Sequence, residues 1–331
     1  MTPNHPPPSE DGLIPPIILL GNVRSGTSMV QSFFDHVEGT RAWFEPRTVW
    51  AYAAPGRRHD RFTAKDATPK VIRYIRGRFI KKQQEMGGRI MEKTPSNILR
   101  VPYVRAIFPE CKLIYILREP LANLSSAEFR WQKTINKGQL RSRLAETPSF
   151  QIPYYATRFA VDQFRKRVLK SKHVSIWGVR YPGVYGDRAE MPVEHVIAKQ
   201  WAYGAKAARE DIAQIERQHP GTVLSVRYED LVRDPEPVFR KMCAHVGAEL
   251  TDDVAATVAS KADPSRQDKW KRLDPELIRA VLPYVAQEMV ENGYEPPTEM
   301  PTEEERRAIL SSEHLSSGGG GASARLGRSD G

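Results

Sequence analysis

The chain has 331 residues, of which 40% are hydrophobic and 27% charged, a composition that excludes collagen-like, coiled-coil and wholly disordered proteins. Lysine and arginine number 50 against 40 aspartate and glutamate residues, and the net charge of +10 favours an anionic partner without choosing among nucleic acid, anionic lipid and phosphorylated small molecules. The only cysteines, Cys111 and Cys243, exclude a disulfide framework and a cysteine-rich zinc site. Two separate reduced thiols are expected, although one disulfide stays open.

Both ends of the chain differ in composition from its middle. Residues 1–13 are polar and rich in proline, which predicts a disordered lead, and residues 298–331 run into glycine and serine, which predicts a flexible tail. The apolar run 13–20 is broken by two prolines and is shorter than the about 20 residues of a membrane span. It also lacks the pattern of a secretion signal. We therefore expect a cytoplasmic protein without a transmembrane segment, folded over residues 14–297.

Apolar runs alternate with helical patterns through this folded part. In chain order the pattern predicts strand 17–20, a helix after Gly26, strand 89–92, helix 97–108, strand 113–117, helix 192–217, strand 222–227 and helix 277–290. Such alternation indicates an α/β fold, with a central parallel sheet and helices on both faces. Ligands of these folds bind at the carboxyl ends of the strands. Residues 131–191 fit the rhythm poorly and are interpreted as an insertion over this edge, or as an irregular surface excursion.

A glycine loop follows the first predicted strand directly, with the sequence Gly21-Asn22-Val23-Arg24-Ser25-Gly26-Thr27-Ser28. Strand, loop and helix in this order can direct several backbone N–H groups and the helix dipole at one anion. Arg24 adds a full charge, and Ser25, Thr27 and Ser28 add hydroxyl donors. The loop differs from that of nucleoside triphosphatases because Thr27 stands where they have lysine. A purely structural turn between strand and helix is the alternative.

At this loop the sequence resembles sulfotransferases that use 3′-phosphoadenosine 5′-phosphosulfate (PAPS), in the version with arginine found in the carbohydrate and tyrosylprotein branches. Their second signature is a strand ending in arginine, with a serine eight positions later. Here Arg118 ends strand 113–117, and Ser126 follows at that spacing. The resemblance implies that Arg118 and Ser126 hold the 3′-phosphate of PAPS, and the chemistry agrees because a guanidinium can bind phosphate oxygens bidentately.

Softer matches extend the resemblance over about residues 17–295, apart from 131–191. They are residues 91–97, similar to an E-K-T-P-x-N segment, residues 226–231 with Y-E-D-L, and Trp270 to Tyr294, similar to a segment that closes over the nucleotide. The family implies a fold like that of P-loop nucleoside triphosphatases. It also implies PAPS as sulfuryl donor, 3′-phosphoadenosine 5′-phosphate (PAP) as product, and no metal.

Sulfuryl transfer resembles phosphoryl transfer, so positioning and electrostatic stabilisation carry most of the catalysis. By resemblance, Arg24 and the loop amides hold the 5′-phosphate, and Lys93 neutralises the leaving phosphate. Glu45, followed by Arg47, is similar to an E-x-R segment of the tyrosylprotein branch, in which the glutamate is the base and the arginine faces the acceptor. We expect an aromatic surround to raise the pKa of Glu45. A surface lysine is the alternative for Lys93, and a surface Glu45–Arg47 pair or a helix-cap contact is the alternative for Glu45.

Three further residues complete the predicted site. Tyr228 is assigned to the adenine or, equally, to scaffolding. Arg266 is the choice for the rest of the 3′-phosphate pocket, with Ser265 and Lys269 as alternatives. Trp177 is assigned to the acceptor pocket, although packing is the better explanation of that residue alone.

The sequence as a whole predicts an enzyme that transfers the sulfuryl group of PAPS to a hydroxyl of a sugar, glycolipid or other natural product. The competing hypotheses are a P-loop kinase or triphosphatase, and a non-catalytic protein that binds anions or nucleic acid. Neither a dedicated nucleic-acid module nor a metal-ligand spacing is present. The basic runs 73–82 and 165–172 fit solvated faces, but peripheral membrane contact stays open, as does the oligomeric state.

Overall fold

The structure is a computed structural model that describes residues 6–131, 157, 176–264 and 267–318. Its centre is a sheet of five parallel strands in the order β2-β3-β1-β4-β5. The strands are β1 (Ile17–Gly21), β2 (Thr40–Phe44), β3 (Arg89–Lys93), β4 (Lys112–Leu117) and β5 (Val223–Arg227). The predicted α/β class with a parallel sheet is confirmed.

Strand β1 lies in the middle because its side chains are apolar on both faces. Ile17 and Leu19 enter one hydrophobic core, and Ile18 and Leu20 enter the other, all with no exposed surface. A strand buried on both faces needs helices on both sides, since each layer removes one row of side chains from water.

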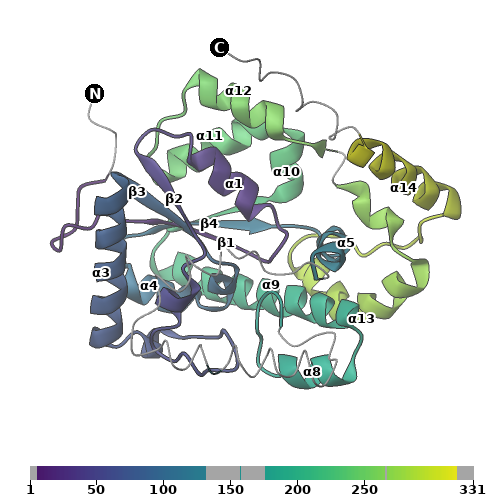
Figure 1. Ribbon diagram of the computed structural model, residues 1–331, viewed down its shortest axis with the longest axis horizontal. Coiled ribbons are helices and arrows are strands. Elements are labelled where there is room, and N and C mark those ends of the chain that lie inside the picture. The colour runs from purple at the N-terminus through teal and green to yellow at the C-terminus, as the bar shows by residue number, and fades with distance from the viewer. Residues whose placement is uncertain (1–5, 132–156, 158–175, 265–266, 319–331) are drawn as a thin grey trace, which may run out of the picture.

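The helices form these two layers, which lie above and below the sheet in Figure 1. One core contains α1 (Thr27–Phe34), α10 (Tyr228–Arg233), α11 (Pro235–Val246) and α12 (Asp252–Lys261). The other contains α3 (Pro69–Met86), α4 (Val101–Ile107), α8 (Val184–Glu190), α9 (Val193–Gln218) and α13 (Pro275–Glu291), with the first turns of α5 (Pro120–Trp131). In the first layer Phe239 meets Phe33 and Phe34 edge to face.

The structure corrects two local predictions. Helix 97–108 is divided into a 3₁₀ turn, η2 (Pro95–Leu99), and α4, and Asn97 is buried in the turn and donates a hydrogen bond of 2.9 Å to Glu92. Strand β2 was not predicted, because its sequence TRAWF lacks an apolar run.

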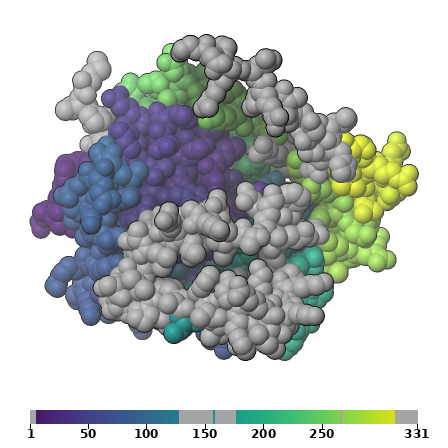
Figure 2. Space-filling view, viewed as in Figure 1, coloured from purple at the N-terminus to yellow at the C-terminus, as the bar shows by residue number. Residues whose placement is uncertain are grey.

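The described parts of the predicted lead and tail make contacts. Residues 9–13 form a turn against α3, and Leu13 has no exposed surface. Within the predicted tail, α14 (Glu303–Gly318), yellow in Figure 2, forms ion pairs with Lys271 and Asp274 through Glu305 and Arg306. Of the predicted insertion 131–191, residues 132–156 and 158–175 lie outside the described part of the chain.

No helix in the described ranges is both long and apolar enough to cross a membrane.

Candidate functional site

The predicted site residues gather at the edge where all five parallel strands end. They follow or close the strands in this way: Arg24 after β1, Glu45 after β2, Lys93 at the end of β3, Arg118 after β4 and Tyr228 after β5. Strand β1 is flanked by β3 and β4, so chain segments diverge on both sides of its loop. This divergence is the place where open α/β sheets bind ligands.

The loop after β1 needs its unusual backbone. Arg24 has φ 68° and Gly26 has φ 85°, both in the left-handed region. A Cβ atom on Gly26 would lie 2.4 Å from the ring of Tyr228, so no larger residue fits there. The loop therefore turns tightly into α1, whose first N–H groups have no partner within the helix and are available to an anion.

The two predicted phosphate signatures lie together although they are about a hundred positions apart. Arg24 donates from Nε to Oγ of Ser126 at 2.9 Å, and Arg118 donates from Nη1 to the carbonyl oxygen of Arg24 at 2.9 Å. Asn123 also donates from Nδ2 to the carbonyl oxygen of Val23 at 2.7 Å. The loop and the start of α5 thus form one cationic unit.

Arg118 is buried within this unit. Its guanidinium carbon lies 4.4 Å from the centre of the Tyr228 ring, which places a cation over an aromatic face. Its carbonyl oxygen accepts a hydrogen bond of 2.9 Å from Nε1 of the buried Trp201 on α9. These contacts hold in place the residue that the sequence assigns to a phosphate.

Glu45 and Lys93 form a buried ion pair at the other side of the loop. Lys93 Nζ lies 2.9 Å from Oε1 of Glu45, and Arg47 donates from Nη2 to Oε2 of Glu45 at 2.6 Å. The pair forms because Phe44 on β2 lies in register with Lys93 on β3, and the next residue along β2 is Glu45. Glu45 itself adopts a left-handed backbone with φ 47°.

The charge state of Glu45 differs from the expectation. Burial raises the pKa of this carboxyl, but Arg47 and Lys93 together outweigh burial and hold its pKa below the usual value. The expected rise of the pKa is therefore wrong, because the expected aromatic surround is replaced by two cations. The pKa of Lys93 is lowered by burial, which its attraction to Glu45 only partly offsets.

One family model, described as a sulfotransferase domain, matches residues 15–273 of the chain. The chain belongs to the sulfotransferase family. It is a PAPS-dependent enzyme, which sets aside the kinase or triphosphatase and the non-catalytic binding protein as alternatives.

Solved structures of sulfotransferases are also similar to this one. A sulfotransferase domain from the curacin biosynthetic pathway is 15% identical, covers 86% of this chain and 100% of its own, and has a TM-score of 0.47. A sulfotransferase from Alicyclobacillus acidocaldarius is 15% identical over 85% and 96% of the two chains, with a TM-score of 0.43. A mouse sulfotransferase complexed with PAP is 13% identical over 93% and 91%, with a TM-score of 0.42. No curated protein matches the chain.

The side chains at the sulfotransferase edge suit a doubly phosphorylated nucleotide. Gly26 leaves a cradle that a Cβ would close, Arg24 and Arg118 supply charge at two places, and Ser126 adds a hydroxyl beside Arg24. The described residues contain no group of three or more His, Cys, Asp or Glu side chains that could hold a metal ion.

The remaining predicted residues stand further out. Arg266 and Ser265 lie outside the described residues. Lys269 lies in the 3₁₀ turn η5 (Asp268–Arg272), where its carbonyl oxygen accepts from Ser125 Oγ at 3.0 Å, one residue before Ser126. Trp177 is partly buried, and its carbonyl oxygen accepts from Gln200 on α9 at 2.8 Å.

Sequence reasoning missed several residues of the site. Arg272 donates from Nε to Ser125 Oγ at 2.8 Å, and Asn123 and Trp201 support the loop and Arg118. Phe44 is half exposed, with Lys93 Nζ 4.5 Å from its ring centre. The position of Phe44 directly before Glu45 was the available signal, whereas Trp201 and Arg272 carry no motif.

Proposed function

We propose that this sulfotransferase transfers the sulfuryl group of PAPS to a hydroxyl of a sugar, glycolipid or other natural product, with Glu45 as the general base. The observation that carries the proposal is the buried Glu45–Lys93 pair, 2.9 Å apart at the same sheet edge as the phosphate loop. A carboxylate that accepts a proton and a cation that stabilises a leaving phosphate are the two parts that in-line transfer requires.

The nucleotide would be held from two sides. Arg24 and the N–H groups of the first turn of α1 would bind the 5′-phosphosulfate, with Ser25, Thr27 and Ser28 as hydroxyl donors. Arg118 and Ser126 would bind the 3′-phosphate, and Tyr228, packed between Gly26 and Arg118, lies beside both. Arg266 is proposed to complete the 3′-phosphate pocket.

The ion pair gives Glu45 and Lys93 linked roles. While Lys93 contacts Glu45, the carboxylate is ionised and weakly basic, because two cations stabilise its charge. When the donor brings negative charge to Lys93, the ammonium becomes shared, and Glu45 loses part of that stabilisation. Its pKa then rises, so the base becomes stronger when the sulfuryl group is in place.

Arg47 and Trp177 are proposed to face the acceptor. Arg47 is the more exposed partner of Glu45, with 38% of its side-chain surface accessible against 10% for Glu45. A guanidinium in that position can donate to the acceptor's oxygen atoms while it still holds the base.

Profiling acceptors with isotopically labelled PAPS, over a panel of sugars, glycolipids and phenolic or aliphatic alcohols, tests the reaction. Glu45→Gln should lower kcat for any accepted substrate by about 10²-fold or more and leave PAP affinity nearly unchanged. Glu85→Gln on α3, an exposed glutamate paired with Lys82, is the matched control and should change neither. Unchanged turnover in Glu45→Gln would dismiss Glu45 as the base.

A further inference from the structure

The carboxylate of Glu229, at the start of α10, connects three segments that are distant in sequence. Its Oε1 accepts a hydrogen bond of 3.0 Å from the backbone N–H of Glu119, and its Oε2 accepts one of 2.9 Å from the hydroxyl of Tyr294. Its backbone carbonyl oxygen also accepts from Nε2 of Gln267 at 3.0 Å. One acidic residue thus joins the end of β4, the approach to η5 and the residues after α13.

The Glu119 contact matters because it completes the support of a single peptide group. The peptide between Arg118 and Glu119 has its carbonyl oxygen bonded by the indole of Trp201 at 2.9 Å and its N–H bonded by Glu229 at 3.0 Å. A peptide plane held at both polar atoms cannot rotate freely, so the direction in which the Arg118 side chain leaves the backbone is fixed.

Tyr294 is itself held firmly, so it can support Glu229. It is 8% exposed, its backbone N–H donates to the carbonyl oxygen of Met289 at 2.8 Å, and the guanidinium of Arg227 lies 4.5 Å from its ring centre. Arg227 in turn donates to the carbonyl oxygen of Asn292 at 3.0 Å. The end of α13 is therefore locked to β5, and the Tyr294 hydroxyl has a fixed position.

The arrangement also places acidic groups next to a cationic site. Glu119 is buried and accepts from the N–H groups of Leu121 and Ala122 in the first turn of α5. Burial raises the pKa of Glu119 to about 7, and the neighbouring charge of Glu229 adds to the rise. Glu229 is a second carboxylate near the proposed phosphate pocket, and its negative charge opposes the binding of an anion there. The hydrogen bond that it accepts from the peptide N–H of Glu119 gives it a structural role at this place.

We propose that Glu229, supported by Tyr294, is a positioning residue for Arg118 and sets the preference of the nucleotide site for a 3′-phosphate. The inference rests on the proposed role of Arg118 in binding that phosphate. Glu229 touches neither nucleotide nor acceptor in this scheme. It acts through the peptide group that directs the guanidinium, because an arginine that samples several directions binds a phosphate less tightly than one held in place.

Calorimetric binding of PAP and AMP to the full chain tests the proposal, since the two nucleotides differ in the 3′-phosphate. Glu229→Ala should weaken PAP binding about tenfold and AMP binding by less than about twofold. The loss corresponds to about one charge-assisted hydrogen bond between Arg118 and the 3′-phosphate, which AMP lacks. Glu229→Gln should bind PAP nearly as the parent does, because an amide can accept from Glu119 and donate to Tyr294. Glu236→Ala, which removes an exposed glutamate paired with Arg240, should change neither affinity.

Two further variants separate the possible failures. Tyr294→Phe keeps the ring and removes only the hydroxyl, so it should lower the PAP to AMP affinity ratio by a few-fold, and it decides the question if Glu229→Ala does not fold. Arg118→Ala should abolish most of the ratio. If Arg118→Ala lowers the ratio while Tyr294→Phe and Glu229→Ala do not, the positioning role is overturned. If Arg118→Ala leaves the ratio unchanged, the assignment of the 3′-phosphate site fails instead.

Discussion

Single residues at the phosphate loop show how little freedom the site allows. Gly26 is in a conformation that residues with a Cβ rarely adopt, and the ring of Tyr228 occupies the space that a Cβ would need. The same ring lies under Arg118. A change at Gly26 would therefore disturb the loop and the proposed 3′-phosphate site together.

We expect Gly26→Ala to lower PAP affinity by at least about tenfold, because the loop must move to relieve the contact with Tyr228. Gly77→Ala is the matched control. Gly77 lies within α3 with nothing near its Cβ position, so alanine there should stabilise the fold by up to about 1 kcal/mol and leave PAP affinity unchanged. Calorimetry and urea unfolding measure both effects. Parent-like PAP affinity in Gly26→Ala would contradict the close packing of the loop.

Lys93 compensates the charge of Glu45, and it is also the residue proposed to stabilise the leaving phosphate. We expect Lys93→Met to lower kcat by about 10²-fold, because the leaving phosphate loses its cation. The same change removes one of the two cations that hold the pKa of Glu45 down, so that pKa should rise, and the acid limb of the remaining activity should move to higher pH. Steady-state rates between pH 4 and 8 would show this. An acid limb in the same place as the parent's would mean that Lys93 does not govern the base.

At the scale of elements, the sequence predicts those strands and helices whose hydrophobic pattern lies within one short stretch of the chain. Four of the five strands and the long helix α9 follow from apolar runs and helical spacing. Strand β2 and the break between η2 and α4 do not follow from such patterns. Gln31 on α1 joins β2 to β3 by donating to the carbonyl oxygens of Trp43 and Met91. In η2, Asn97 donates a hydrogen bond to Glu92. These contacts join residues from different elements and leave no periodic pattern.

The residues of the candidate site also divide into those that a local motif predicts and those whose contacts depend on distant parts of the chain. Arg24, Arg118 and Ser126 carry motifs and were predicted, whereas their contact depends on the strand order β1-β4. The charge state of Glu45 could not be predicted, because it depends on Lys93 as well as on the neighbouring Arg47, and Lys93 is 48 positions away and meets Glu45 only through the β2–β3 register. Glu229 lies within a recognised segment, but its partners Glu119 and Tyr294 are 110 and 65 positions distant.

Strand β3 carries a buried acid whose charge state affects stability. Glu92 accepts from Thr94 Oγ1 and from Asn97 Nδ2 at 2.9 Å, and burial raises its pKa to about 7. The pKa of Glu92 is higher in the folded than in the unfolded protein, so the protonated carboxyl makes its full contribution to folding stability below the unfolded pKa. That contribution is lost as pH rises through about 7. The folded protein should therefore tolerate a neutral side chain here better than the charged one.

We expect Glu92→Gln to become more stable relative to the parent as pH rises from 5 to 8, by up to about 3 kcal/mol. The amide keeps the contact with Thr94, and Asn97 can turn its Oδ1 atom, which has no hydrogen-bond partner, toward the new amide group. Glu119 contributes in the same direction in both proteins and cancels in the difference. Urea unfolding at several pH values measures the gap, and parallel curves for the two proteins would show that Glu92 does not titrate on folding.

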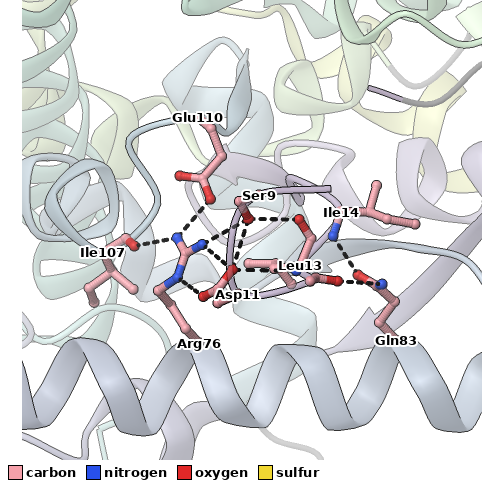
Figure 3. Close-up of polar contacts among 9 residues, drawn as sticks. Ser9, Asp11, Leu13, Ile14, Arg76, Gln83, Ile107 and Glu110 are labelled. Carbon is pink, nitrogen blue, oxygen red and sulfur yellow. Dashed lines mark hydrogen bonds and ion pairs between the residues drawn. The ribbon is translucent and has the colours of Figure 1, made fainter. Parts of the chain in front are cut away.

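At the scale of the whole molecule, different parts of the chain lie at the two edges of the sheet. The carboxyl edge holds the site, whereas the chain before β1 is fixed near the amino edge. There Ser9 and Asp11 contact Arg76 on α3, Gln83 binds the N–H of Ile14, and Leu13 is buried in the core (Figure 3). Composition alone predicted disorder for this segment, since Arg76, the ion-pair partner of Asp11, lies 65 positions away.

The relative size of two contributions in this turn can be predicted. Asp11→Ala should cost about 1 kcal/mol of unfolding free energy or less, because the pair with Arg76 is partly exposed and Arg76 keeps its contact with Glu110 at 2.7 Å. Leu13→Ala should cost about 2 to 4 kcal/mol, since it removes a fully buried side chain. The Arg76 hydrogen bond holds the pKa of Asp11 below its usual value, so the Asp11 effect should fade as pH falls below about 4.

Urea unfolding of both variants at pH 7 and at about pH 3, with PAP affinity measured alongside, checks this order. PAP affinity should be unchanged in both, because the turn lies near the amino edge of the sheet and the phosphate loop follows its carboxyl edge. If the segment before β1 contributed nothing, both variants would unfold as the parent does. If the ion pair rather than the apolar anchor held the turn, Asp11→Ala would be the more damaging change, and the buried leucine would not be what attaches this segment to the core.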